Sequence, residues 1–319
     1  MQVRFWGTRG SLPVALSAAD VRRRVVDAVR ASRGRDLVGE AAIEGFVDTL
    51  PFAARGTYGG NSSCVEIVTG GDEFLLLDAG SGLRAFGQWA LANGHATAGR
   101  TFHLVISHLH WDHIMGFPLF TPAYIPGNRI CIHGCHAQLE AAFRGQHSAP
   151  GFPIEFDQLA ARIEFSTLQP GVATTIAGLR VTPKLQLHGG DSYGYRIDGK
   201  GKTLVYSTDS EHKLENPEET ESFVDFFRAA DLVIFDAMYS LADAVSVKSD
   251  WGHSSNIVGV ELCQMAGVRH LCLFHHEPVF DDARLDTVLE ETRRLERLTR
   301  GDRAPLVVST AYDGLTVDL

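Results

Sequence analysis

The chain has 319 residues, 45% hydrophobic and 21% charged, a composition typical of a globular protein and not of a disordered or fibrous one. Its net charge of −10 argues against binding of long nucleic acid through an overall positive field, but a bound metal could still attract a small anionic substrate. The sequence shows no signal-peptide pattern and no apolar run of the roughly 20 residues that span a bilayer, so we expect a cytoplasmic protein that does not contact membranes.

The N-terminal part contains a helical segment between stretches with β character. Residues 3–6 are expected to form a strand, and residues 18–33 and 40–50 two helices, the first capped by Ser17 or Asp20. The segment from about residue 14 to residue 55 is therefore predicted to be a helical insertion or lid. Its arginines could contact phosphate or line a solvated helix face, and the insertion as a whole could pack on a second subunit.

The remaining chain has further strands and helices in both halves. Strands are expected at residues 64–68, 73–77, 104–107, 129–133, 162–166, 179–187, 193–197, 203–207, 232–236, 271–274 and 306–309, and helices at 83–93, 136–144, 218–229, 254–266 and 283–297. This order predicts an α/β protein with two sheets covered by helices, in one domain over residues 1–319.

A dense group of metal-ligand residues follows the apolar strand at 104–107. Three histidines and one aspartate fall within six positions: His108, His110, Asp112 and His113. Imidazole and carboxylate groups suit Zn²⁺ and related divalent ions. A loop that curls after a strand can present the first two residues to one ion and the last two to a second, so we predict a two-metal hydrolase.

The His-x-His-x-Asp-His pattern after a strand resembles the signature of the metallo-β-lactamase fold. The segments Gly-Thr-Arg-Gly-Ser at 7–11, Tyr-Gly-Gly-Asn at 58–61 and Leu-Asp-Ala-Gly at 77–80 resemble the branch that contains ribonuclease Z and the small-molecule phosphodiesterases. The resemblance covers nearly the whole chain outside the insertion. It implies a four-layer αββα sandwich with the metals at the edge between the sheets.

The resemblance also implies three further ligands, each after a strand. His188 fits the third histidine, Asp209 the aspartate that bridges both ions, and His275 the last histidine. His276 is the alternative to His275, and Asp191 the weaker alternative to Asp209. The other candidate ligands are expected to be structural or on the surface: His133, His136, His147, Cys131 and Cys135. One ion would then be held by His108, His110, His188 and Asp209, and the other by Asp112, His113, Asp209 and His275.

The Gly-His-Ser segment at 252–254 contains a histidine, His253, that is expected to act in catalysis without binding a metal. In the resembled branch such a histidine lies near the metals without binding them, so His253 is expected to donate to a phosphoryl oxygen or to protonate the leaving alkoxide. Asp112 is also expected to orient the attacking hydroxide. Asp236 and Tyr239 are expected to orient His253 or to shape the pocket.

These features favour phosphodiester hydrolysis among the activities of this fold. Only 20 residues separate His188 from Asp209, which leaves no room for the long basic arm with which ribonuclease Z grips tRNA. We therefore expect a small substrate, a cyclic nucleotide or cyclic ribose phosphate, with Zn²⁺ or alternatively Mn²⁺ or Fe²⁺. A ribonuclease Z-like endonuclease, a lactone or amide hydrolase, and a non-catalytic metal- or nucleotide-binding protein stay open, and a homodimer is expected.

Overall fold

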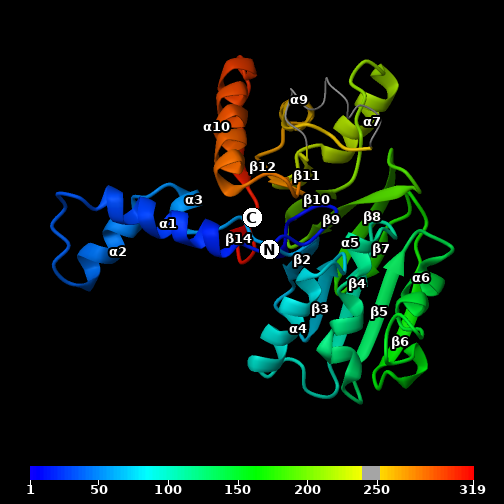
Figure 1. The fold of residues 1–319 in the computed structure, drawn as a ribbon. Coiled ribbons are helices and arrows are strands. Elements are labelled where there is room, and N and C mark those ends of the chain that lie inside the picture. The colour runs from blue at the N-terminus through cyan, green and yellow to red at the C-terminus, as the bar shows by residue number, and fades with distance from the viewer. Residues whose placement is uncertain (239–251) are drawn as a thin grey trace.

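Two β-sheets packed face to face form the body of the protein. The structure is a computed structural model that describes residues 1–238 and 252–319. In these residues the first sheet has the strand order β14-β1-β2-β3-β4-β5-β6 and the second β13-β12-β11-β10-β9-β8-β7 (Figure 1). The strands of the first sheet are β1 (Gln2–Gly7), β2 (Cys64–Val68), β3 (Glu73–Leu77), β4 (Thr101–Val105), β5 (Arg129–Gly134), β6 (Arg162–Thr167) and β14 (Thr316–Asp318). Those of the second are β7 (Thr174–Ile176), β8 (Leu179–Gln186), β9 (Ser192–Gly199), β10 (Lys202–Ser207), β11 (Leu232–Asp236), β12 (His270–Phe274) and β13 (Val307–Thr310).

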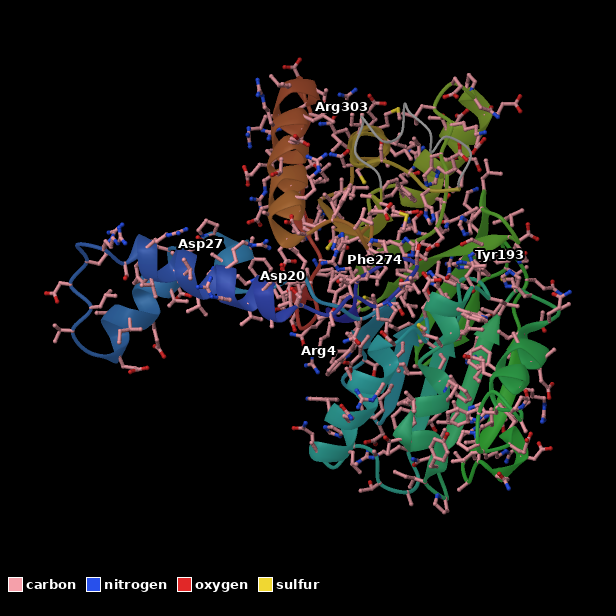
Figure 2. The ribbon with its side chains drawn as sticks, viewed as in Figure 1. Arg4, Asp20, Asp27, Tyr193, Phe274 and Arg303 are labelled. Atoms are coloured by element: carbon pink, nitrogen blue, oxygen red, sulfur yellow. The ribbon has the colours of Figure 1, made fainter. Side chains whose placement is uncertain are left out.

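Three apolar layers hold the sheets and helices together. The inner faces of both sheets meet in one core, in which Phe5 packs against Phe274. Figure 2 marks Phe274. The outer face of the first sheet is covered by α4 (Gly82–Ala92) and α6 (Leu139–Gln146), and that of the second by α7 (Pro217–Phe227), α9 (Asn256–Ala266) and α10 (Asp282–Thr299). The predicted αββα arrangement is therefore confirmed.

The sequence pattern explains why the strands take these positions. From Leu179 to Lys184 of β8, buried residues alternate with more accessible ones, as in a strand with one face in the core. In contrast, β11 is buried along its whole length, because it runs parallel between β10 and β12 with apolar layers on both sides. None of the described helices is long and apolar enough to cross a membrane.

Several predicted boundaries differ from the observed ones. The strand expected at 104–107 is β4, which begins earlier, at Thr101, and also ends earlier, at Val105. It ends before Ser107 because the Ser107 N–H bonds to the Asp78 carboxylate and not to a neighbouring strand. The helix expected at 136–144 begins three residues later, at Leu139. The three-residue strands β7 and β14 were not predicted, since three residues carry too little periodicity.

Residues 12–55, which follow β1 and precede β2 in the sequence, form a helical arm that projects from the body (Figure 1). It comprises α1 (Ala18–Ala31), α2 (Glu40–Asp48) and the short α3 (Phe52–Arg55). As predicted, Ser17 caps α1, and Asp20 completes a capping box with it. The arm is fixed at its base, where the Arg24 guanidinium pairs with the Asp282 carboxylate at the start of α10.

Candidate metal centre

Loops at the carboxyl ends of four strands meet at the edge between the two sheets. Residues 108–113 follow β4 and include the short helix α5 (Trp111–Ile114). In the second sheet, β8, β10 and β12 run in the same direction, so their ends lie at the same edge. His188, Asp209 and His275 stand just beyond those three ends.

The first donor group contains three imidazoles and one carboxylate. Its members are those expected for the first ion, His108, His110, His188 and Asp209, and their donor atoms all lie within 4.8 Å of one another. His188 Nε2 lies 3.2 Å from His110 Nδ1 and 3.7 Å from Asp209 Oδ2. The structure thus brings together four residues from three loops, as the sequence predicted.

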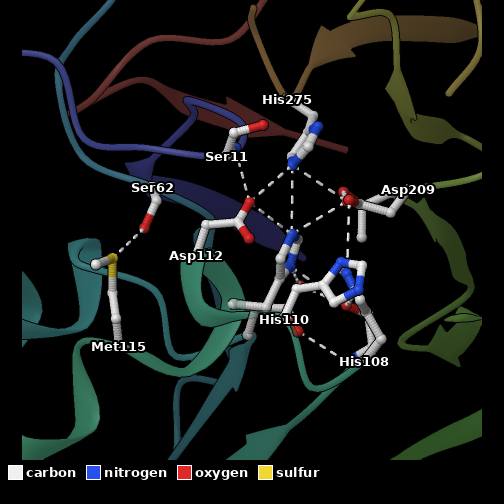
Figure 3. A network of polar contacts seen from close by, with 12 residues as sticks. Ser11, Ser62, His108, His110, Asp112, Met115, Asp209 and His275 are labelled. Atoms are coloured by element: carbon white, nitrogen blue, oxygen red, sulfur yellow. Dashed lines mark hydrogen bonds and ion pairs between the residues drawn. The ribbon is translucent and has the colours of Figure 1, made fainter. Parts of the chain in front are cut away.

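The second donor group shares Asp209 with the first. It consists of Asp112, His113, Asp209 and His275, again with donor atoms within 4.8 Å of one another. Figure 3 labels three of them, Asp112, Asp209 and His275. Asp209 Oδ1 lies 3.1 Å from His113 Nε2 and 3.2 Å from His275 Nε2, while its Oδ2 faces His108 at 3.6 Å. One carboxylate therefore offers one oxygen to each group, the geometry expected of a bridging ligand.

The donor groups fit divalent metal ions in chemistry and in protonation. His108 Nε2 is buried and has no hydrogen-bond partner, although a buried polar nitrogen normally has one. Burial lowers the pKa of His108, His110 and His188, so these imidazoles are neutral and present lone pairs near neutral pH. Neutral imidazoles with ionised carboxylates are the ligand set that Zn²⁺, Mn²⁺ and Fe²⁺ accept.

A protonated His113 balances the carboxylates of the metal-free second group. Burial alone would lower the pKa of His113, but the carboxylates of Asp209, Asp112 and Asp78 outweigh it and hold that pKa well above its ordinary value. The imidazolium places a positive charge where an ion would bind, so the proton and the ion compete for the same nitrogen.

Metal titration of the metal-free protein should therefore release a proton. We expect the first ion to bind neutral imidazoles without proton release, and the second to displace about one proton per chain from His113 at pH 7. Isothermal titration calorimetry in buffers of different ionisation enthalpy measures this number. Heats of the second event that do not depend on the buffer would contradict the assignment of His113.

Contacts outside the donor groups fix the orientation of the donors. Asp78 Oδ2 accepts hydrogen bonds from His113 Nδ1 at 2.7 Å, from Tyr206 Oη at 2.7 Å and from Ser107 Oγ at 2.9 Å. His188 Nδ1 donates to the Gly252 carbonyl at 2.8 Å. Such bonds select the tautomer that leaves Nε2 available for a metal. The role of Asp78 was not predicted, although it lies in the Leu-Asp-Ala-Gly segment at 77–80.

The N-terminal loop also reaches the centre. The Ser11 N–H donates to Asp112 Oδ2 at 2.8 Å (Figure 3). A side chain at Gly10 would approach the His275 ring to 2.6 Å, so only glycine lets the backbone lie against that imidazole. This steric constraint explains why a glycine stands at position 10 of the segment 7–11.

Three residues of the centre have left-handed backbone conformations. Asp78, Asp209 and His275 have φ angles of +60°, +40° and +59°. Non-glycine residues rarely adopt this region, and such strain gathers at functional sites, where the surrounding structure enforces it. Each of these residues comes within two positions of a strand end, so the sharp turn directs its side chain to the sheet edge.

His253 lies beside both donor groups. Its ring centroid is 5.0 Å from that of His188 and 5.2 Å from that of His275. His253 Nδ1 donates to Asp236 Oδ2 at 2.8 Å, as expected for a histidine oriented by Asp236. Burial lowers the pKa of His253, but Asp236 outweighs this and raises it to about 9 in the metal-free protein. Asp236, His253 and His275 also form a third group of close donors, but Asp236 engages Nδ1 of His253.

The competing histidines have other partners. His276 Nε2 donates to the Ala311 carbonyl, His136 Nε2 to the Asp191 carbonyl, and His147 Nδ1 to the Ile154 carbonyl. His133 lies 3.0 Å from His103 within the first sheet. All four are buried, so His133, His136 and His147 have structural positions, and the alternative expectation that they lie on the surface is wrong. Neither they nor Asp191, Cys131 or Cys135 belongs to a donor group in the described residues, and Tyr239 lies outside those residues.

Comparison with known proteins identifies the family of the chain. Residues 74–276 match the model of the beta-lactamase superfamily domain. The chain is 23% identical to ribonuclease Z of Oceanobacillus iheyensis over 267 residues, which cover 65% of this chain and 84% of that protein. It is 28% identical to an uncharacterized protein of Mycobacterium leprae over 208 residues, 64% of this chain and 67% of that protein.

Solved structures with low sequence identity share the fold. The metallo-beta-lactamase fold protein YhfI of Bacillus subtilis superposes with a TM-score of 0.65 at 18% identity, covering 99% of this chain and 98% of that one. A diphosphatase of the PhnP family gives a TM-score of 0.59 at 18% identity, over 100% and 97% of the two chains. The short form of human tRNase Z gives 0.57 at 18% identity, over 100% and 99%. With a family match over more than half of its length, the chain belongs to the beta-lactamase superfamily and is a metal-dependent hydrolase of the metallo-β-lactamase fold.

Proposed function

We propose that the protein hydrolyses small phosphodiesters, cyclic nucleotides or cyclic ribose phosphates, with two divalent ions held by the two donor groups. Zn²⁺ is the proposed ion, with Mn²⁺ and Fe²⁺ as alternatives. The observation that carries the proposal is His253, a histidine oriented by Asp236 beside donor groups that share Asp209. This combination supports the proposal that His253 is a proton donor beside a site that would bind an anion.

The two ions would supply the positive charge that stabilises the phosphoryl group in the transition state and would make a water acidic enough to ionise near neutral pH. Asp112, held by the Ser11 N–H, is placed to orient the attacking group. His253 acts on the leaving side. Because Asp236 engages its Nδ1, its Nε2 is the atom that would give a proton to the leaving alkoxide.

The chain segment between His188 and Asp209 is short, which supports a small substrate. β8, β9 and β10 form an antiparallel meander, in which only a short turn at 200–201 joins β9 to β10. No segment between the third histidine and the bridging aspartate is left to form an arm for tRNA. Together with the net charge of −10, this favours a substrate that fits at the centre itself.

A ribonuclease activity is the second candidate, because the curated relative from Oceanobacillus iheyensis bears the name ribonuclease Z. A substrate panel separates the two: bis(p-nitrophenyl) phosphate, several cyclic nucleotides, a precursor tRNA, a lactone and a β-lactam, each with Zn²⁺ or Mn²⁺. We expect turnover of the small phosphodiesters and little cleavage of the tRNA. Good turnover of a lactone or β-lactam without phosphodiester hydrolysis would overturn the proposal. Cyclic-nucleotide binding without any turnover, abolished by His110→Ala, would indicate a non-catalytic binding protein.

Trp111 is proposed to distinguish substrates with a nucleobase from those without one. Its side chain is 78% exposed, and it stands between the candidate ligands His110 and Asp112. Stacking of a base on an aromatic side chain is worth about 1–3 kcal/mol. We therefore expect Trp111→Ala to raise KM for cyclic nucleotides by about tenfold, and Trp111→Phe to keep it near the wild-type value. A cyclic ribose phosphate without a base should be unaffected; equal effects on both substrates would contradict stacking.

A further inference from the structure

The helical arm exposes apolar side chains that the rest of the chain does not cover. None of the side chains of residues 11–57 is buried. Eight of the eighteen large hydrophobic side chains that are exposed in the described residues belong to this short segment. Figure 2 shows the arm, marked by Asp20 and Asp27, standing away from the packed body. Such a concentration on one element is typical of an interaction surface.

The exposed residues form a stripe on each of the two longer helices. On α1, Val21, Val25 and Val29 follow one another at four-residue intervals and are 49%, 58% and 62% exposed. On α2, Ile43 and Val47 have the same spacing and are 42% and 38% exposed. Helices of fourteen and nine residues are marginal in water by themselves, so a partner that covers these stripes would stabilise both helices.

The two halves of the arm carry opposite charges. Residues 17–35 contain six arginines and two aspartates, a net charge of +4, while residues 36–54 contain four carboxylates and no basic residue, a net charge of −4. The ion pairs of α1 lie within the helix, Arg23–Asp20 and Arg30–Asp27, or reach the body, Arg24–Asp282. Across residues 12–55, all of which the structure describes, no ion pair joins the basic half to the acidic half. The arginines outside these pairs, Arg22, Arg33 and Arg35, and the four carboxylates of the acidic half can therefore pair with charges outside the chain.

We propose that the arm binds the arm of a second copy of this chain, with α1 of one protomer against α2 of its partner and the reverse. A two-fold axis brings each basic apolar helix onto an acidic apolar helix twice, which satisfies both stripes and both charge sets in one closed interface. An RNA partner would require a basic surface, but residues 12–55 have a net charge of only +1 and α2 would repel phosphate. This proposal is independent of the proposed substrate.

The base of the arm is braced, which gives the interface a defined direction. Besides the Arg24–Asp282 pair, Asp286 on α10 accepts hydrogen bonds from the Ala53 N–H at 3.1 Å and from Tyr58 Oη at 2.6 Å. A fixed arm loses less freedom on association than a flexible one, which favours dimerisation through a modest surface.

Charge exchange on the chain of 319 residues tests the proposal by analytical ultracentrifugation. The basic-reversed variant carries Arg22→Glu, Arg33→Glu and Arg35→Glu, and the acidic-reversed variant carries Asp36→Lys, Glu44→Lys and Asp48→Lys. We expect the wild type to dimerise and each variant alone to have a dimer Kd raised by about tenfold or more. A one-to-one mixture should regain the dimer, because every helix then meets an opposite charge.

Controls separate loss of the interface from loss of the fold. Circular dichroism and phosphodiester hydrolysis of both variants should match the wild type. A matched triple reversal elsewhere on the surface, Arg180→Glu, Arg294→Glu and Arg297→Glu, should leave the dimer unchanged. A wild type that is monomeric at all concentrations, a dimer indifferent to both variants, or a mixture that stays monomeric would each overturn the proposal. A monomer that binds fluorescently labelled tRNA through the same arginines would identify RNA as the occupant instead.

Discussion

The Asp209→Asn variant is expected to lose nearly all phosphodiester hydrolysis and to retain fewer than two metal ions. Among the described residues, Asp209 alone is shared by the two main donor groups, with one oxygen directed to each, so its loss weakens both at once. Because the charge that metal ions supply is worth several kcal/mol, we expect kcat to fall at least about a thousandfold. Metal content after dialysis and steady-state kinetics on bis(p-nitrophenyl) phosphate measure the two effects.

Asp191→Asn is the matched control for this variant. Asp191 also follows His188 in sequence and also has a positive φ, of +59°, but its side chain is exposed and belongs to neither donor group. We expect near wild-type metal content and activity. If Asp191→Asn were as damaging as Asp209→Asn, or if Asp209→Asn kept two ions and full activity, the assignment of the bridging ligand would be wrong.

The His253→Ala variant is expected to separate substrates by their leaving groups. A cyclic nucleotide expels an alkoxide that needs a proton, so kcat should fall by about 10²–10⁴. The p-nitrophenolate of bis(p-nitrophenyl) phosphate leaves without one, so the loss there should stay below about tenfold. Metal content should not change. Equal losses on both substrates, or loss of an ion, would mean that His253 serves the metals and not the leaving group.

Asp236→Asn tests the source of the proton-donor property. The Asp236 carboxylate raises the pKa of His253 in the metal-free protein to about 9 against the effect of burial, and bound divalent ions would lower it from that value. Removal of the carboxylate lowers the pKa further, so less His253 is protonated at a given pH. The basic limb of the kcat profile should therefore move to lower pH, and an unchanged limb would contradict a donor role for His253.

The fold could be predicted from the sequence because most of its elements are long and periodic. Strands such as β11 and helices such as α10 carry enough apolar residues to mark their positions, and their order leads to two sheets covered by helices. The three-residue edge strands carry no such signal. The direction of the arm was not predictable either, since it depends on contacts with α10 that have no local pattern.

The candidate ligands could be predicted because each follows a strand end, where chemistry-bearing side chains of this fold gather. The donor groups in the structure contain the residues that the sequence indicated, and the choice of His275 over His276 agrees with their different surroundings. The orienting contacts could not be predicted. Asp78 is a single aspartate after a strand, and only the folded chain brings it to His113 across 35 positions. The Gly252 carbonyl, which fixes His188, has no side chain to signal it.

The most direct test of the two-ion account is a titration of metal-free protein with Zn²⁺ or Mn²⁺, in which bound metal and cyclic-nucleotide hydrolysis are measured on the same samples. We expect no hydrolysis in chelator, two bound ions per chain at saturation, and activity that rises with the second equivalent. Full activity with no ion or one ion, or two bound ions without phosphodiester turnover, would contradict it.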